Sequence, residues 1–387
     1  ECTENVALLE SQGRVLAEAV VADRDQPPFR RATRDGFACR AADVGGPLRI
    51  VGQIRAGDPA SLNFPLLRGG EAVEIMTGAP VPDGADCVVM VEHVILDGGE
   101  VTVEPGRKMR AGDNIVPAGA EALKGTVVLP VGTRPSANHL GAAAACGYSQ
   151  VEVYRRPRVA VLATGDELVE LDAPVLPFQI RNSNSYSLAA QVAAAGGEPA
   201  RLPVARDDPS AIEAAIRDAM ACDLVLLSGG VSAGRYDFVE TVLLSMGAEF
   251  LFTGVLMQPG RPVVFGRIRV CAGEYKYFFG LPGNPVSTLV TFALFVRPVI
   301  DALSGALPDS LRFVTARLAE AINVKPGLTR FLPAHMANGP NFQAWVNLIP
   351  WQGSGDLAST ARANCYLVVP PDGTHLEAGE AVAVLLD

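Results

Sequence analysis

The stretch Thr164-Gly165-Asp166-Glu167-Leu168 directly follows the apolar run Arg158 to Ala163, and two later segments of the chain repeat this arrangement. They are Ser228-Gly229-Gly230-Val231-Ser232-Ala233-Gly234-Arg235-Tyr236-Asp237, after Leu224 to Leu227, and Gly280-Leu281-Pro282-Gly283-Asn284-Pro285. Each segment is therefore predicted to be a loop that leaves the end of a strand, where open α/β sheets bind their ligands. We expect the three loops to form one site.

These loops combine a flexible backbone with negative charge. Glycine and proline let backbone N–H groups approach an anion closely, and Ser228 to Gly234 offers several such groups ahead of a helix. Glu167 and Asp237 bring carboxylates to the same loops. The pairing predicts a phosphate together with a divalent cation. Each motif alone also has a plain structural interpretation, as an exposed turn carboxylate or an ordinary glycine-rich turn.

Composition limits the class of protein. The chain has 387 residues, which at roughly 100 to 200 residues per domain predicts two to four domains. It is 49% hydrophobic and 19% charged, which is typical of a folded protein with a packed core. The net charge is −10 and the chain contains no long basic run, which argues against a nucleic-acid partner.

Cysteine and histidine usage gives little support for a metal or disulfide framework. The seven cysteines are scattered and include no C-x-x-C pair, which predicts a reducing compartment and buried thiols. The four histidines have no i, i+4 pairing, so a zinc site has little support. The most apolar segment, Val286 to Ile300, is interrupted by Arg297 and Pro298 and is shorter than the roughly 18 to 20 apolar residues of a membrane span. We expect a buried helix there, no signal peptide, no membrane partner and a cytoplasmic protein.

The first part of the chain changes pattern twice. Residues Asn5 to Ala19 place apolar side chains at helical spacing, so we expect the chain to start with a helix. From Pro27 to Pro117, short β-like runs separated by Gly, Pro and Asp predict a β-rich domain. Ser136 to Cys146 has a helical pattern, and Val151 to Tyr154 a strand pattern. Packing of the first helix with this later segment would make one discontinuous domain.

Strands and helices then alternate, which predicts a mainly parallel sheet with helices on both faces. The expected strands are Arg158 to Ala163, Leu202 to Val204 and Leu224 to Leu227, and the expected helices are Ser185 to Ala195, Ser210 to Met220 and Phe238 to Met246. Asp208 is placed to cap the second helix, with Pro209 in its first turn, so at most one of Asp207 and Asp208 is free for chemistry. Residues Phe313 to Asp387 contain short alternating runs that predict a small β-barrel or sandwich.

Further segments accompany the three loops in a fixed order along the chain. They are Gly13-Arg14-Val15-Leu16-Ala17-Glu18, Pro27-Pro28-Phe29, Thr33-Arg34-Asp35-Gly36-Phe37-Ala38, Ile75-Met76-Thr77-Gly78-Ala79-Pro80-Val81-Pro82, Asp86-Cys87-Val88-Val89-Met90-Val91-Glu92, Gly353-Ser354-Gly355 and Ala363-Asn364. With these segments the chain resembles the molybdopterin molybdenumtransferase family, the molybdenum-insertion enzymes that include the E domain of gephyrin. The resemblance covers nearly the whole chain.

The resemblance implies a reaction and an assembly. In that family an adenylylated molybdopterin meets molybdate, the metal enters the dithiolene, and AMP is released with the assistance of Mg²⁺. Adenylylated molybdopterin and molybdate are then the implied substrates, and Mg²⁺ the implied cofactor. The family forms elongated homodimers in which the α/β domain of one chain faces the β-rich domain of the other, so a shared site is implied. A molybdopterin adenylyltransferase and molybdoenzyme chaperones are further candidate partners.

The resemblance also divides the chain and assigns roles to its residues. The implied parts are a discontinuous linking domain (residues 1–22 and 119–153), a β-rich domain (23–118), a MogA-like α/β molybdopterin-binding domain (154–305) and a C-terminal β domain (306–387). The implied catalytic residues are Glu167, Asp207 and Asp237, which are also the implied metal ligands, with Asp35 and Thr77 from the facing domain. The implied cofactor-binding residues are Thr164, Gly165, Ser228, Gly229, Gly230, Ser232, Gly234, Pro259, Gly260, Arg261, Pro282, Gly283, Asn284 and Pro285.

Elementary electrostatics supports the acidic set. Clustered carboxylates would repel a pyrophosphate unless a cation lay between them, and Mg²⁺ binds one or two carboxylates together with phosphate oxygens and waters. Acidic loops beside a phosphate-binding backbone therefore predict a metal ion.

The chain departs from the family pattern at several positions. Asn114 stands where members commonly have a carboxylate, and Gly254 and Gln258 stand where some have lysine, although Arg261 keeps one cation. If Asn114 faces the incoming oxyanion, Asn114→Asp should lower the Mg²⁺ requirement and raise the molybdate requirement. Two alternatives stay open, a molybdopterin adenylyltransferase and a non-catalytic pterin-binding scaffold or carrier. The Asn114 change favours the scaffold, and the retained acidic set favours catalysis.

Overall fold

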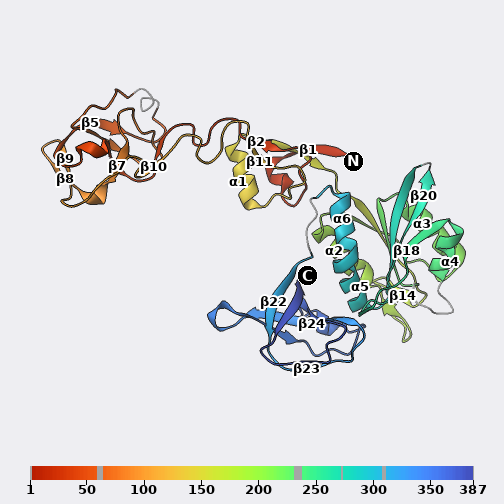
Figure 1. Ribbon diagram of the computed structural model, residues 1–387. Coiled ribbons are helices and arrows are strands. Elements are labelled where there is room, and N and C mark those ends of the chain that lie inside the picture. The colour runs from red at the N-terminus through yellow and green to blue at the C-terminus, as the bar shows by residue number, and fades with distance from the viewer. Residues whose placement is uncertain (1, 59–63, 231–237, 272, 307–310, 387) are drawn as a thin grey trace.

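The computed structural model describes residues 2–58, 64–230, 238–271, 273–306 and 311–386. The chain is elongated (Figure 1), with a β-rich part at one end, a small part containing α1 in the middle, and an α/β part beside a C-terminal β part at the other end. We keep the four-domain division given above as a proposal.

The β-rich part contains a six-stranded sheet in the order β7-β4-β6-β5-β9-β8. Alternate residues of its strands enter two apolar clusters, one containing Ala38 and Val88 and the other Phe37 and Val89, as expected for a sheet covered on both faces. Its strands are β4 (Gly36–Cys39), β5 (Leu48–Ile54), β6 (Glu71–Ile75), β7 (Cys87–Met90), β8 (Val94–Asp97) and β9 (Glu100–Val103). The β-like texture predicted between Pro27 and Pro117 is confirmed.

The chain does not start with the predicted helix. It starts with the strand β1 (Thr3–Ala7), which pairs antiparallel with β12 (Gln150–Tyr154), followed by a short 3-10 helix, Leu8–Ser11. Gly13 then adopts φ 73°, a left-handed conformation that ends helical geometry. Strand pairing with a segment remote in the sequence overrides the helical spacing of the local sequence.

The same middle part holds the helix predicted near Cys146. That helix is α1 (Ala137–Ala145), and β2 (Val20–Val21) pairs with β11 (Val127–Leu129) beside it. Leu16, Val20 and Val153 are buried in one cluster, so the beginning of the chain and the segment near residue 150 share a core. The predicted packing of these two segments is therefore observed, with a strand in place of the first helix.

The α/β part contains a six-stranded sheet in the order β16-β13-β17-β21-β20-β18. Its strands are β16 (Glu198–Arg201), β13 (Arg158–Ala163), β17 (Leu224–Ser228), β21 (Glu274–Leu281), β20 (Val264–Cys271) and β18 (Ala248–Phe252). The first four are parallel, and only β20 among the described strands of this sheet runs in the opposite direction. The strand predicted at Leu202 to Val204 lies instead at Glu198–Arg201, where it pairs with the beginning of β13, and Pro203 has no N–H to extend the ladder.

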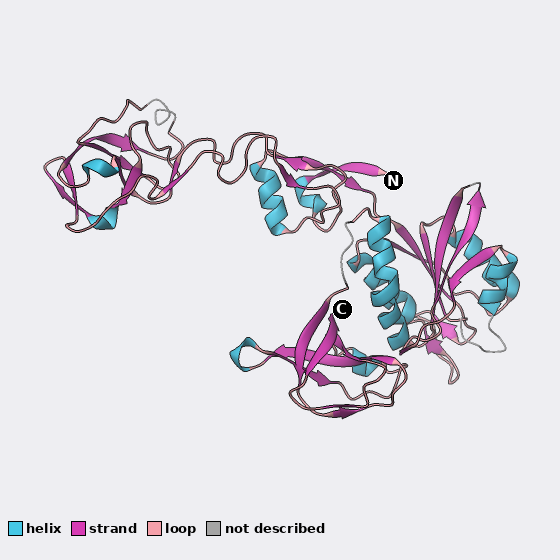
Figure 2. Cartoon of the chain, in the orientation of Figure 1, coloured by secondary structure: helices cyan, strands magenta, loops and turns pink. Residues whose placement is uncertain are grey.

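Helices cover both faces of this sheet (Figure 2), as the alternation predicts. On one face, α3 (Pro209–Ala219) and α4 (Phe238–Ser245) bury Ile212, Ile216 and Val239 against the sheet. On the other face lie α2 (Asn184–Ala194) and one continuous helix made of α5 (Pro285–Thr291), a π-helical segment (Phe292–Val296) and α6 (Arg297–Leu303). The Asp208 side chain accepts from the Ala211 N–H, which confirms the predicted cap.

The continuous helix Pro285–Leu303 is long and apolar enough to cross a membrane by length and composition alone. Half of its most apolar 18-residue stretch is buried inside the structure. Val286, Val290, Val296 and Ile300 are fully buried. These contacts are those of a core helix, as predicted from its sequence.

The C-terminal part is a closed barrel of five strands. The strands β24, β25, β22, β28 and β26 pair in that order, and β26 pairs back onto β24. Their bounds are β22 (Phe313–Leu318), β24 (Thr329–Asn338), β25 (Ala344–Leu348), β26 (Cys365–Val369) and β28 (Ala381–Leu386). The strand β19 (Met257–Gln258) adds to β24, and Met257 and Val286 pack with Phe331, so the barrel is fastened to the α/β part.

Candidate functional site

A cavity of about 740 Å³ lies at the carboxyl ends of β13, β17 and β21. Residues of all three loops singled out in the sequence line it, with Ser228, Gly229 and Gly230 as the described part of the second loop, so the loops meet at one cavity as expected. A fourth segment, residues 180–184, lines it as well and runs from β15 (Ile180–Arg181) to the first residue of α2. Gly355 and Leu357 reach the cavity from the C-terminal part. The size is within the range of pockets that hold small-molecule ligands.

Two carboxylates share this cavity. Glu167 lies on the loop after β13 and Asp207 on the loop after β16, and both line the cavity. The two loops are tied together because the Asp166 N–H donates to Asp207 Oδ2 and the Asp207 N–H donates to Asp166 Oδ1, both at 3.4 Å. A Cβ on Gly165 would come within 2.6 Å of Glu167 Oε2, so the glycine leaves room for this carboxylate to fold back over the loop.

The loop after β17 passes very close to the loop after β13. Gly229 and Gly230 have φ values of 93° and 67°, which favour glycine. A Cβ on Gly229 would lie 2.8 Å from the Thr164 carbonyl oxygen, and one on Gly230 would lie 2.4 Å from Val239 Cγ2. Backbone shape and space therefore both require glycine at the place where an anion-binding turn was predicted.

Gly230→Ala is expected to destabilise the protein by about 1–3 kcal/mol, because the new methyl group meets Val239 and the residue must hold a left-handed conformation. The change in the free energy of unfolding would be measured by urea denaturation. Gly247→Ala is the matched control, since Gly247 has φ 81° and a Cβ added there would have no neighbouring atom within 4 Å. If both variants lose the same free energy of unfolding, the contact with Val239 does not contribute to the destabilisation of Gly230→Ala.

Asn184 holds two of the loops together. Its Nδ2 donates to Ser228 Oγ at 2.9 Å and to the Gly283 carbonyl oxygen at 2.7 Å. Thr288 adds a second tie, since its hydroxyl donates to the Pro282 carbonyl oxygen at 2.6 Å. The position of the third loop is therefore set by polar side chains at the beginnings of α2 and α5.

Sequence reasoning missed the segment at residues 180–184. Arg181, Asn182, Ser183 and Asn184 all line the cavity, and Arg181 brings a positive charge to the wall. The available signal was the cluster of Asn and Ser side chains directly before an expected helix, where such residues are usually explained as caps.

Most of the predicted cofactor-binding residues line the cavity. Those that do are Thr164, Gly165, Ser228, Gly229, Gly230, Pro282, Gly283, Asn284 and Pro285. Pro259, Gly260 and Arg261 do not line it, although the next residue, Pro262, does. Gly260 instead faces the helix α5, since a Cβ there would lie 2.5 Å from Thr291 Cγ2. Ser232, Gly234 and Asp237 lie outside the described residues.

The predicted metal ligands are only partly brought together. Within the part of the chain that the structure describes, no group of three or more His, Cys, Asp or Glu side chains is placed to hold a metal ion. Glu167 and Asp207 line one cavity. Two carboxylates are sufficient for Mg²⁺ when phosphate oxygens and waters complete its shell, so these residues fit a cation that binds together with a phosphorylated substrate.

Asp35 and Thr77 contact each other and are far from this cavity in the same chain. The Thr77 N–H donates to Asp35 Oδ1 at 2.6 Å, and this hydrogen bond lowers the pKa of the Asp35 carboxyl. Both belong to the β-rich part, at the opposite end of the molecule from the α/β part (Figure 1). A single chain therefore presents the two predicted halves of the site separately.

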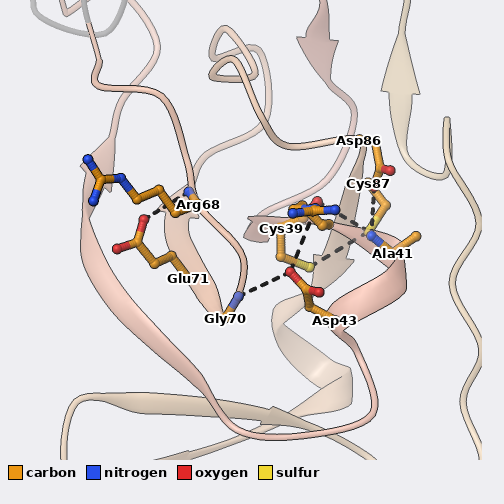
Figure 3. A network of polar contacts seen from close by, with 9 residues as sticks. Cys39, Ala41, Asp43, Arg68, Gly70, Glu71, Asp86 and Cys87 are labelled. Atoms are coloured by element: carbon orange, nitrogen blue, oxygen red, sulfur yellow. Dashed lines mark hydrogen bonds and ion pairs between the residues drawn. The ribbon is translucent and has the colours of Figure 1, made fainter.

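A network of polar contacts supports the sheet that carries Asp35 (Figure 3). Asp86 Oδ1 accepts from the Ala41 N–H at 2.7 Å, and Asp43 Oδ2 accepts from the Gly70 N–H at 3.1 Å. Between them, Cys39 and Cys87 are fully buried with their sulfur atoms 3.7 Å apart. The hydrogen bond with Cys39 and burial raise the pKa of Cys87, which keeps the Cys87 thiol neutral.

All seven cysteines are free thiols. Five are buried, as expected for thiols used as small apolar side chains. Cys2 and Cys271 are exposed, and for these two the expectation of burial is wrong.

Asn114 has a structural role of its own. It is one of the few described residues other than glycine with positive φ, at 60°, a conformation that asparagine tolerates. Its Nδ2 donates to the Val88 carbonyl oxygen at 2.8 Å, so the amide group already forms a hydrogen bond inside the β-rich part. The hypothesis that Asn114 faces the incoming oxyanion has no support in this geometry.

Asn114→Asp is expected to destabilise the protein by about 1–3 kcal/mol, because a carboxylate in place of the amide would face the Val88 carbonyl oxygen without a proton to donate. Thermal unfolding of both proteins at neutral pH would measure the loss. The exposed Asn341 has φ 58° and provides the control, Asn341→Asp, for the effect of the backbone conformation alone. A stable Asn114→Asp protein with altered molybdate dependence would restore the hypothesis of a contact with the oxyanion.

Comparisons with known proteins agree with this architecture. Three family models match in succession: the MoeA N-terminal region (domain I and II) at residues 1–147, a probable molybdopterin binding domain at 160–302, and the MoeA C-terminal region (domain IV) at 315–386. The molybdopterin molybdenumtransferases of Bacillus subtilis and of a Nostoc species are each 36% identical to this chain, covering 99% of it and 90% and 88% of their own lengths. A crystal structure of the molybdopterin biosynthesis moeA protein from Pyrococcus horikoshii OT3 matches with a TM-score of 0.81 at 32% identity, over 100% of this chain and 95% of that one. The chain belongs to the molybdopterin molybdenumtransferase family.

Proposed function

We propose that the protein transfers molybdenum from molybdate to adenylylated molybdopterin and releases AMP, in the biosynthesis of the molybdenum cofactor. One observation carries the proposal: a single cavity combines a glycine turn that can bind phosphate with two carboxylates, Glu167 and Asp207. The same cavity lies within the region that matches a probable molybdopterin binding domain.

The residues of the cavity have separate tasks in this reaction. The turn at Gly229 and Gly230 brings backbone close to the ligand, where N–H groups bind phosphate oxygens. Arg181 adds one positive charge from the segment at residues 180–184. Glu167 and Asp207 would hold Mg²⁺, which when bound would neutralise the phosphates that these carboxylates otherwise repel. The loops are held in place by Asn184.

We propose further that the working unit is a homodimer. Asp35 and Thr77 are paired at the end of the molecule remote from their own cavity, where a second copy of the chain is able to receive them. The enzyme is proposed to act in the cytoplasm, which the free thiols support. A molybdopterin adenylyltransferase that supplies the substrate and chaperones that receive the product are proposed partners.

The proposal is tested by measuring AMP release from adenylylated molybdopterin with purified protein. We expect release to require both molybdate and Mg²⁺, and to stop in excess chelator and resume when Mg²⁺ is restored. Release that is independent of molybdate would indicate simple hydrolysis. Tight binding of the substrate without release would instead favour a scaffold or carrier.

A further inference from the structure

Three enclosed polar side chains in the wall of the cavity have an atom without a hydrogen-bond partner among the described residues. These atoms are the hydroxyl oxygen of Thr164, the amide nitrogen of Asn182 and the amide oxygen of Asn184. The exposed fractions of the three residues are 4%, 1% and 9%. Burying a polar group without a partner destabilises a protein. Three such groups belong to residues that line one cavity, where a bound ligand would supply the partners.

The orientation of both amides is set by backbone groups. The atom of Asn184 that lies 2.7 Å from the Gly283 carbonyl oxygen must be nitrogen, because a carbonyl only accepts. In Asn182, the oxygen accepts from the Ser185 N–H at 3.2 Å, and an N–H only donates. The unused atoms are consequently a donor on Asn182 and an acceptor on Asn184.

Thr164 completes the set at the junction of two loops. Its own N–H donates to the Ser228 carbonyl oxygen at 3.1 Å, so its backbone is fastened to β17. A Cβ on Gly230 would come within 3.0 Å of Thr164 Oγ1, so the glycine turn is what allows the backbone to pass this hydroxyl. The hydroxyl is able to donate or to accept.

We propose that Thr164, Asn182 and Asn184 bind the neutral amide edge of the substrate's pterin ring, an inference that rests on the proposed function. That edge presents one acceptor, the ring carbonyl oxygen, and two donors, the ring N–H and the exocyclic amino group. The wall offers the complement, with Asn182 donating to the carbonyl and Asn184 and Thr164 accepting from the two donors. This assigns the heterocycle to a different set of residues from the one that handles phosphate.

Other parts of the substrate match this set less well. A phosphate has only acceptor oxygens, so it would leave the Asn184 oxygen without a partner and repel it. An adenine edge offers one amino donor and one ring acceptor, which leaves one of the three atoms unused. The three atoms each expose less than 1 Å² in the free protein, so binding of the ring requires a shift of side chains in the wall.

Isosteric variants of the full-length protein test the assignment. Thr164→Val keeps the shape and removes the hydroxyl, and Thr164→Ser retains the hydroxyl as a control. Asn182→Asp keeps the oxygen that accepts from Ser185 and removes the free donor. The probes are 6-hydroxymethylpterin and AMP, with dissociation constants measured by calorimetry.

We expect Thr164→Val and Asn182→Asp each to weaken pterin binding about tenfold, the loss of one hydrogen bond. Thr164→Val, which adds no charge, should change AMP binding by less than about twofold. Thr164→Ser should bind the pterin like the wild type. Unchanged pterin affinity in both variants would overturn the proposal, as would an equal loss of AMP affinity in Thr164→Val or no pterin binding by the wild type at millimolar concentration. If Thr164→Val does not fold, Asn182→Asp carries the test.

The outcome is separable from that of the proposed function. If the wild type releases AMP only with molybdate but the variants bind the pterin with unchanged affinity, the proposed function stands and the assignment of the pterin contacts is wrong. If the wild type shows no molybdate-dependent AMP release but the variants lose pterin affinity selectively, the pterin site stands and the proposed function is wrong.

Discussion

Glu167→Gln is expected to lower molybdate-dependent AMP release by about 10²- to 10³-fold, the loss typical of removing one charge-stabilising group from an active site. The substitution keeps the size of the side chain and removes the charge that would hold Mg²⁺ against the phosphates. Because Glu167 is exposed on a loop at the end of β13, the free energy of unfolding should stay within about 0.5 kcal/mol of the wild-type value. Single-turnover release of AMP under saturating substrate measures the effect.

The matched control for this prediction is Glu170→Gln. Glu170 lies three residues further along, does not line the cavity, and forms an exposed ion pair with Arg201 at 3.3 Å. Such a pair contributes little to stability, so Glu170→Gln should leave turnover unchanged. The Mg²⁺ concentration for half-maximal release should rise in Glu167→Gln and stay constant in Glu170→Gln. Wild-type turnover in Glu167→Gln would remove this carboxylate from the site.

The α/β part illustrates which features a sequence predicts well. The apolar runs at Arg158 to Ala163 and Leu224 to Leu227 are buried on both faces, so hydrophobicity alone identifies them as central strands. Since parallel strands end at one edge, the loops after β13, β17 and β21 had to meet, and they do. The local chemistry of Asp208 and Pro209 likewise predicted the start of α3.

Features that depend on distant pairing were not predictable in the same way. The segment Thr3–Ala7 becomes a strand because β12, close to residue 150, offers it an edge, which no local pattern reveals. Asn184 is similar, since its importance comes from Gly283, a partner brought near only by the fold. In the sequence, Asn114 is only a departure from a family carboxylate, whereas its positive φ and its bond to Val88 are visible in the structure alone.

A mixture of Asp35→Asn and Glu167→Gln chains should recover activity that neither variant has alone. Asp35 and Thr77 are paired far from the cavity that holds Glu167 and Asp207, so one chain cannot assemble both halves of the proposed site. In a mixed dimer, the Asp35→Asn chain keeps an intact cavity and receives an intact Asp35 from its partner. Random exchange makes half of the dimers mixed with one working site each, so we expect about a quarter of wild-type activity.

Glu167→Gln mixed with Asp207→Asn provides the control for this experiment. Both substitutions fall in the same cavity, so every cavity of every dimer carries a defect and no activity should return. Differently tagged chains, purified in sequence through both tags, would establish that subunits have exchanged. If exchanged Asp35→Asn and Glu167→Gln dimers stay inactive, the site is not shared between chains. If the control mixture also recovers activity, the two carboxylates do not act in one cavity. Two defects can complement each other only when they affect different sites.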